Sequence, residues 1–176
     1  MAAKFYGTLD PNGGQTLIGG DSGLHQTILN NSAVITLGDA VKTDANGNIV
    51  LAGAGGPFLG FVTDILKNGA SIRDAASLDT YTAESDNETV DKVYCMVDVS
   101  RKSLWSLPQD GTAGTTVNSN ERGAYIDFVA ASDELDEDTA TRTRATSGQC
   151  TTFGADQDDS TRLVVAINES ELISAI

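Results

Sequence analysis

An Asn-Gly pair at residues 46 and 47 lies between two runs of β-forming residues, VITLGDAVKTD and NIVLA. Asn-Gly in this setting is the strongest short-range signal for a β-hairpin, because both residues tolerate a positive φ. A third run, FLGFVTDIL, begins directly after a Gly-Gly-Pro sequence. The chain is therefore expected to reverse direction after short strands, which favours antiparallel sheets over long helices.

The rest of the chain continues this pattern of short apolar runs between turn-forming residues. In KVYCMVDVS, which starts at Lys92, apolar residues alternate with more polar ones, as in a strand buried on one face. The 18 glycines and the many Ser and Thr residues also favour turns and strands. The predicted fold class is mainly β: a compact β-barrel or β-sandwich with hairpin turns, little helix and an extended N-terminal arm. Strands are expected near residues 34–43, 48–52, 58–65, 92–99, 124–130 and 162–167, and one weak helical candidate is SIRDAASL.

The first 32 residues differ from the remainder in composition. They are mostly turn formers, and DPNGGQT and IGGDSG leave few apolar residues between them. We therefore expect residues 1–32 to form an extended arm and residues 33–176 to form a single β-rich domain. A loop-rich lobe of the domain is the alternative for residues 1–32. No repeat of fixed period is visible in the sequence.

The charge of the chain limits its partners. Twenty-five acidic side chains against 11 basic ones give a formal net charge of −14. Nucleic acids and anionic membranes repel such a surface, because binding to them depends on Lys and Arg. The longest uncharged apolar run, residues 49–62, is too short to span a bilayer, and the N-terminal MAAKFYGTLDPNGG lacks the apolar region of a secretory signal. We expect no direct contact with nucleic acid or membrane.

The glycine-rich stretch GDAVKTDANGNIVLAGAGGPFLGFV fits neither a phosphate loop nor a calcium loop. Gly53 and Gly55 match the first two glycines of a dinucleotide fingerprint, but Phe58 takes the third place and β-forming residues follow. In an EF-hand-like loop starting at Asp44, the places of the glycine and the bidentate Glu hold Ile49 and Gly55. The hairpin is therefore the expected structure.

The acidic clusters and the cysteines are interpreted as structural rather than chemical features. The clusters at residues 133–138 and 156–159 are expected to be solvated loops, and the alternative is a divalent cation held where the fold brings them together. Cys95 and Cys150 are interpreted as small buried hydrophobes, with one disulfide as the alternative. No metal and no cofactor is expected.

Residues suited to catalysis are scarce. The single histidine, His25, lies in the glycine-rich arm, where no expected strand or helix fixes it against a nucleophile. Trp105 is interpreted as a core or interface anchor, with a sugar-stacking platform as the alternative. The sequence predicts that the protein is not an enzyme, and no catalytic, cofactor-binding or metal-binding residue is assigned.

The segment LGDAVKTDANGNIVLAGAGGPFLGFV, from Leu37 to Val62, resembles the core of small head decoration (accessory or cement) capsid proteins of tailed bacteriophages. The resemblance extends more loosely over residues 33–176: KVYCMVDV and LWSLPQDGTAGT are similar to a strand and the turn after it in those proteins. DFVAASDELDEDTATRTRATS is similar to their polar loop, and TRLVVAINESEL to their closing strand and C-terminus. The resemblance implies a structural virion protein on the capsid exterior, made in the host cytoplasm, that stabilises the head by bridging neighbouring major capsid proteins. It implies no catalytic residue.

The arm is expected to be ordered against a partner. Residues 1–32 contain too little apolar surface to offset their own ordering entropy, yet large apolar residues are spaced through them. We therefore expect Phe5, Tyr6 and Leu9 to be buried against the major capsid protein or a neighbouring copy of the chain.

The competing prediction is a secreted or cell-surface β-sandwich that binds a glycan or depends on calcium. Such a module would use the acidic loops and the aromatic residues Trp105, Tyr81, Tyr94 and Tyr125.

Overall fold

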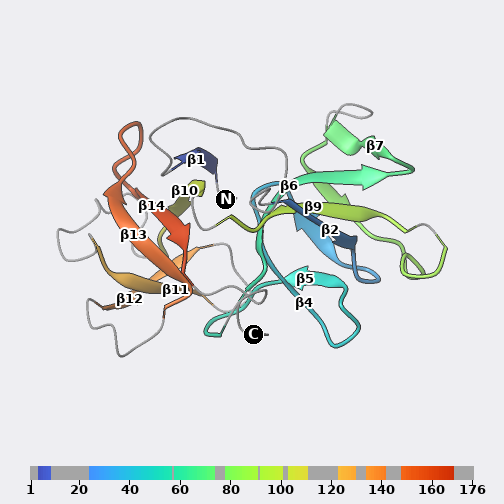
Figure 1. The fold of residues 1–176 in the computed structure, drawn as a ribbon, viewed down its shortest axis with the longest axis horizontal. Helices are drawn as coiled ribbons and strands as arrows, with labels where there is room; N and C mark the ends of the chain where they lie inside the picture. The colour runs from blue at the N-terminus through green and yellow to red at the C-terminus, as the bar shows by residue number, and fades with distance from the viewer. Residues whose placement is uncertain are drawn as a thin grey trace.

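The computed structural model describes residues 4–8, 24–56, 58–73, 78–90, 92–100, 103–110, 123–129, 134–141 and 148–168. These residues are almost entirely β, and the described helical residues are Ile72 and Arg73. Figure 1 shows the strands gathered into two groups that lie side by side. Two six-stranded antiparallel sheets and one two-stranded sheet account for them. The predicted mainly β fold is therefore confirmed.

The N-terminal barrel is built from five strands in the order β2-β9-β6-β4-β5. The sheet curls, because Leu29, directly after β2, forms a parallel bridge with Ile49 at the start of β5. The Asn30 N–H donates to the Ile49 carbonyl at 3.0 Å. The result is a partly closed barrel. Its strands are β2 (Leu24–Ile28), β4 (Ala40–Thr43), β5 (Ile49–Leu51), β6 (Gly60–Lys67) and β9 (Tyr94–Asp98).

Three short strands accompany this barrel. Strand β7 (Ala70–Ser71) pairs with the end of β6, which extends beyond the barrel as a hairpin. Strands β3 (Val34–Thr36) and β8 (Thr80–Thr82) form the separate two-stranded sheet. These strands lie in the connections between the strands of the barrel, so they add to it without changing the strand order.

The C-terminal barrel has the strand order β10-β14-β13-β11-β12, and β1 (Lys4–Thr8) pairs with the outer edge of β10. Gln109, directly after β10, forms a parallel bridge with Leu135 at the start of β12. The Asp110 N–H donates to the Leu135 carbonyl at 3.0 Å. This sheet is therefore partly closed in the same way. Its strands are β10 (Ser103–Pro108), β11 (Tyr125–Phe128), β12 (Leu135–Thr141), β13 (Cys150–Ala155) and β14 (Arg162–Ile167).

The two barrels have one topology. In each, taken in chain order, the first strand pairs with the fifth, the fifth with the fourth, the fourth with the second and the second with the third. Each is closed by a parallel bridge from the residue after the first strand to the start of the third. Both fourth strands carry a bulge against the fifth, between Val62 and Asp64 in β6 and between Thr152 and Gly154 in β13.

Hydrogen bonds at the entry to the second strand repeat the same correspondence. The Gly38 N–H donates to the Val62 carbonyl at 2.7 Å, and the Val62 N–H donates to the Asp39 carbonyl at 3.0 Å. In the other barrel, Gly123 donates to Thr152 at 3.0 Å, and Thr152 donates to Ala124 at 2.9 Å. The chain therefore contains a structural repeat that its sequence does not reveal.

The hydrophobic cores of the barrels are filled differently. The N-terminal barrel encloses aliphatic residues of its own strands and connections, among them Val41, Ile65 and Val97, all with 0 % exposure. The core of the C-terminal barrel also takes in Phe58 and Phe61 from the N-terminal barrel. Because this cluster contains residues of both barrels, it holds them together as one folded structure.

The predicted hairpin is confirmed, but its turn is longer than two residues. Strands β4 and β5 pair with Thr43 opposite Ile49, and the Gly47 N–H donates to the Asp44 carbonyl at 3.0 Å. Gly47 has a φ of +80°, whereas Asn46 is not among the residues with positive φ. This is a type of hairpin loop in which one residue, a glycine, supplies the left-handed conformation. The Asp44 carboxylate accepts hydrogen bonds from the N–H groups of Asn46 and Asn48 at 2.8 and 2.9 Å.

Other strand predictions are met to different degrees. The strand expected at residues 162–167 is β14. The strand expected at residues 34–43 is divided into β3 and β4, because the chain turns at Leu37–Gly38, where Gly38 has a φ of +91°. Of the helical candidate SIRDAASL, only Ile72 and Arg73 are helical, and residues 74–77 lie outside the described residues.

The predicted boundary between an arm and a domain at residue 32 is not a boundary in the structure. Strand β1 pairs with β10, and β2 pairs with β9 along its whole length. Leu29 has 0 % exposure in the N-terminal core. Ladder hydrogen bonds thus place residues 4–8 and 24–28 in the two sheets, which the low apolar content of this region does not reveal. Residues 9–23 lie outside the described residues.

Candidate interaction surface

A buried polar cluster lies in the C-terminal barrel, where β10, β13 and β14 meet. Arg162 and Ser106 are each 1 % exposed and Asp156 is 8 % exposed. The Arg162 guanidinium donates to the Ser106 hydroxyl at 3.0 Å and to the Ser106 carbonyl at 2.6 Å. The Ser106 hydroxyl donates to the Asp156 carboxylate at 2.5 Å. The cluster therefore ties three strands together.

The electrostatics of Asp156 suit this structural role. Burial raises the pKa of the Asp156 carboxyl, but hydrogen bonds from Ser106 and from two backbone N–H groups, together with the charge of Arg162, outweigh it and lower the pKa. The carboxylate is thus stabilised in its ionised form. Its four internal contacts assign Asp156 a role in holding the strands of the barrel.

Asp98, at the end of β9, has the opposite electrostatic environment. Its side chain is 7 % exposed. Burial raises the pKa of its carboxyl, and hydrogen bonds from Ser103 and Ser100 offset this only in part. The backbones of β6 and β9 approach each other closely at Asp98. If Gly60 carried a Cβ, that atom would lie only 2.1 Å from the carbonyl oxygen of Asp98. Ser103 begins β10, so its hydrogen bond to Asp98 links the two barrels, whereas Gly60 lies in the same sheet as Asp98.

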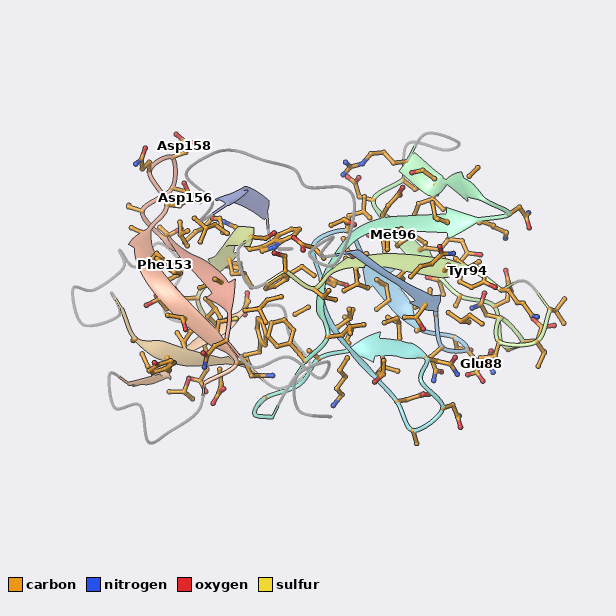
Figure 2. All side chains as sticks on the ribbon, viewed as in Figure 1. Glu88, Tyr94, Met96, Phe153, Asp156 and Asp158 are labelled. Atoms are coloured by element: carbon orange, nitrogen blue, oxygen red, sulfur yellow. The ribbon has the colours of Figure 1, made fainter. Side chains whose placement is uncertain are left out.

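The acidic cluster at residues 156–159 forms the turn between β13 and β14. Figure 2 shows Asp156 and Asp158 at this turn. The Asp156 carboxylate accepts from the Asp158 N–H at 2.9 Å, and the Asp159 carboxylate accepts from the Thr161 N–H and hydroxyl at 3.0 and 2.6 Å. These carboxylates therefore act as acceptors that shape the turn.

The other acidic cluster is not the solvated loop that was expected. Leu135–Thr141 form β12, and Leu135 has 0 % exposure in the C-terminal core. Its partner strand is β11, with Asp127 opposite Asp136. The buried Leu135 side chain and the ladder to β11 outweigh the low strand propensity of the acidic residues. Asp133 and the side chains of Glu137 and Asp138 lie outside what is described. Among the described residues, no group of three or more His, Cys, Asp and Glu side chains is placed to hold a metal ion.

The aromatic and thiol candidates lie in the cores. Trp105 is 3 % exposed and stacks on Phe61 with ring centroids 4.9 Å apart, so it is a core residue and cannot serve as a sugar-stacking surface. Cys95 and Cys150 are both buried and free. Burial raises the pKa of the Cys95 thiol to about 12 and that of Cys150 well above its usual value, which suppresses thiolate chemistry.

Three further candidates are only partly described. His25 lies in β2, where its backbone pairs with Val97 of β9, and its side chain lies outside what is described. The same holds for the side chains of Phe5 and Tyr6, whose backbones belong to β1, while Leu9 is itself outside the described residues. The predicted contact of these three residues with a partner stays a prediction.

The surface of the described residues has scattered apolar side chains and strand edges. The exposed large hydrophobic residues come from different elements, and they are Val34, Leu51, Leu78, Val90 and Phe153. Figure 2 shows Phe153 on the outer side of β13. Apolar residues exposed singly are common on proteins and do not define a binding site. Backbone groups at the sheet edges are therefore the more specific feature for interaction.

Comparison with known proteins identifies no relative. No family model matches the chain, and neither the curated proteins nor the solved structures give a significant match. In the part of the chain that the structure describes, no helix has the length and hydropathy needed to cross a membrane. A functional conclusion therefore depends on the buried polar groups and the surface of this protein alone.

Proposed function

We propose that this protein is a structural virion protein that binds the outer surface of a capsid lattice and stabilises the head by bridging major capsid proteins. The observation that carries the proposal is that the buried ionisable and nucleophilic side chains of the described residues serve the fold. Arg162, Asp156 and Asp98 are engaged in internal contacts, and Cys95 and Cys150 are held as thiols by burial. Because these buried groups serve the fold, the surface is the part of the described structure that we assign to binding a partner.

The charge and the architecture fit this position. A formal net charge of −14 disfavours a site beside packaged DNA and suits the exterior of a particle. Two barrels joined by a shared core give a rigid body that can touch more than one neighbour. A ligand that binds only the assembled lattice stabilises that lattice by mass action, as any ligand stabilises the state it prefers. No enzymatic step is part of this proposal.

The glycan-binding or calcium-dependent alternative has less support. Its main aromatic candidate, Trp105, is buried in the core. Tyr81 is half-buried, and its hydroxyl lies 3.1 Å from the Lys67 ammonium, which donates to it. The carboxylates of Asp156 and Asp159 are engaged in their own turn. No described feature favours this alternative over the structural role.

Co-sedimentation tests the proposal directly. Purified protein is mixed with expanded heads of the phage that encodes it, prepared without this protein. We expect saturable binding with a fixed copy number per head, competition by unlabelled protein, and a higher temperature for DNA release. Absence of saturable binding would overturn the proposal, and a calcium- or glycan-dependent rise in the melting temperature of the isolated protein would favour the alternative.

A further inference from the structure

The structural repeat makes it possible to compare the first strands of the two barrels. Strand β10 pairs with β14 through Trp105 opposite Val165, and β2 pairs with β9 through His25 opposite Val97. Because Val165 and Val97 occupy the same place in their barrels, His25 corresponds to Trp105. By the same registers, Gln26 corresponds to Ser106 and Leu24 to Leu104.

In the C-terminal barrel, the outer edge of β10 is covered. Strand β1 pairs with it antiparallel, with Lys4 opposite Ser106 and Gly7 opposite Leu104. Strand β1 therefore satisfies backbone groups of β10 that point away from β14. An edge strand with unpaired N–H and C=O groups is a template for pairing with another chain, and covering it removes that possibility.

In the N-terminal barrel, the corresponding edge of β2 has no such cover among the described residues. The Leu29 N–H donates to the Val93 carbonyl at 2.9 Å, so the backbone groups of Leu29, Thr27 and His25 face β9. Those of Leu24 and Gln26 then face away from it. No strand of the described residues pairs with this side of β2, and the bridge to β5 begins only at Leu29.

We propose that the β2 edge at Leu24–Gln26 is a strand-addition site for a second copy of the chain, which docks there through its own β1. Strand β1 is the last strand of its sheet, so only one of its edges is engaged by β10 in the described structure. Its other edge would pair with β2 of the neighbour. Each copy thus offers one donor edge and one acceptor edge, which is a heterologous contact that closes into a ring or extends as a chain.

The repeat is what selects this occupant. The fold already binds an added strand at this place in its other barrel, and the strand that it uses, KFYGT, belongs to the same chain. One contact between two copies would cover both edges. The net charge of −14 opposes the approach of copies, so the association is expected to strengthen as salt screens this repulsion. This inference does not depend on the proposed capsid role, and its tests need no capsids.

A proline substitution can block pairing at the β2 edge without disturbing the pairing inside the barrel. Gln26→Pro removes an N–H group that faces away from β9, so the ladder inside the barrel keeps its hydrogen bonds. Sedimentation velocity at rising protein concentration should show association of the wild type and of the matched control Gln26→Ala. Gln26→Pro should stay monomeric with an unchanged circular dichroism spectrum. A wild type that is monomeric throughout, or a folded Gln26→Pro that associates equally well, would overturn the proposal.

Cysteine cross-linking tests the contact without depending on the proline variant. Because Cys95 and Cys150 are buried thiols, single introduced cysteines report on the surface alone. A Gln26→Cys protein is mixed under mild oxidation with a Lys4→Cys or a Thr8→Cys protein, which place the thiol at opposite ends of β1. We expect a disulfide-linked dimer with one of them, whichever way the strands run.

Val90→Cys is the control for random collision, since Val90 is 67 % exposed in a turn remote in sequence from both strands. Gln26→Cys should link to β1 at least tenfold faster than to Val90→Cys. Equal rates would overturn the proposal. Linking of Gln26→Cys to a capsid protein but not to β1 would also overturn it, by showing a different occupant.

Discussion

The two barrels of this protein have the same pattern of strand pairing but differently packed hydrophobic cores. The N-terminal barrel is packed mostly with aliphatic side chains of its own strands and connections. The C-terminal barrel depends on two aromatic side chains that enter from the other barrel: Phe58 lies edge-on to Phe128 at 5.0 Å, and Phe61 stacks on Trp105. Among the described residues, the core of the second barrel thus includes side chains of the first, whereas the core of the first includes none of the second.

The side chains differ at three equivalent positions of the two barrels. Ser106, Asp156 and Arg162 form the buried cluster of the C-terminal barrel. The ladder registers place Gln26, Leu66 and Tyr94 at the same three positions of the N-terminal barrel. One set is charged and hydrogen-bonded, and the other contains no charge. The backbone ladder therefore sets where strands lie, and the side chains are free to stabilise each barrel by different means.

Phe61→Ala should reveal the largest difference in stability between equivalent positions of the two barrels. Removing the ring leaves a cavity where both barrels meet, and we expect a loss of about 3–5 kcal/mol in the free energy of unfolding. The equivalent residue of the other barrel is Thr151, and Thr151→Ala should cost less than about 1 kcal/mol because it opens no core cavity. Urea unfolding followed by Trp105 fluorescence measures both. Similar costs for the two variants would show that the barrels pack independently.

Gly60→Ala should have the next largest effect. Its Cβ would lie 2.1 Å from the carbonyl oxygen of Asp98, so strands must separate, at a cost near the upper end of about 1–3 kcal/mol. The equivalent residue is Cys150, where a side chain is accommodated in the core, and Cys150→Ala should cost about 1 kcal/mol. Thermal denaturation of the two variants checks this order. A Gly60→Ala protein as stable as the wild type would contradict the close approach of β6 and β9.

Ser106→Ala probes the buried cluster. Losing the hydroxyl removes hydrogen bonds to both Arg162 and Asp156 and leaves buried charge less well solvated, which should cost about 2 kcal/mol. Gln26→Ala, at the equivalent exposed position, should change the free energy of unfolding by less than about 0.5 kcal/mol. Denaturant unfolding of the isolated variants makes the comparison. Equal effects would mean that the cluster adds no stability beyond that of a surface position.

The pH dependence of stability should distinguish the barrels by its sign. Since the pKa of Asp98 is raised on folding, its contribution increases stability as the pH falls through that raised pKa toward the unfolded value. Since the pKa of Asp156 is lowered, its contribution is present above the unfolded pKa and is lost as the pH falls through the lowered one.

The matched variants Asp98→Asn and Asp156→Asn isolate these two contributions. Asp98→Asn should remove the gain at mildly acidic pH, and Asp156→Asn should reduce the loss at strongly acidic pH. Melting temperatures measured from neutral to acidic pH supply both slopes. A wild-type gain that persists in Asp98→Asn would assign the effect to another group.

Local signals in the sequence predicted the elements that local chemistry determines. The hairpin at residues 46–47 was predictable because a glycine is needed where the chain turns left-handed. Strand β14 was predictable because its apolar run is continuous, and all six of its residues are buried. The acidic strand β12 was not predictable, because its place follows from pairing with β11 and from one buried leucine, Leu135.

The candidate surface was less predictable than the fold. The sequence indicates turn formers throughout residues 1–32, and this composition cannot show that Lys4–Thr8 adds to a strand about 100 residues away, at Ser103–Pro108. Such long-range pairing depends on backbone groups, which every residue carries.

The burial of Trp105 as a core residue was predicted and is confirmed, because a large ring between apolar neighbours usually packs inside.

The bulge at the same place in β6 and β13 has an evolutionary consequence. An irregularity repeated at one register position, with the same closing bridge, is what duplication of an ancestral five-stranded gene product would leave behind. Gly38 still matches Gly123 and Val97 still matches Val165, but most other equivalent pairs have diverged. The correspondence between the two barrels is therefore carried by the hydrogen-bond ladder and by few of the residues.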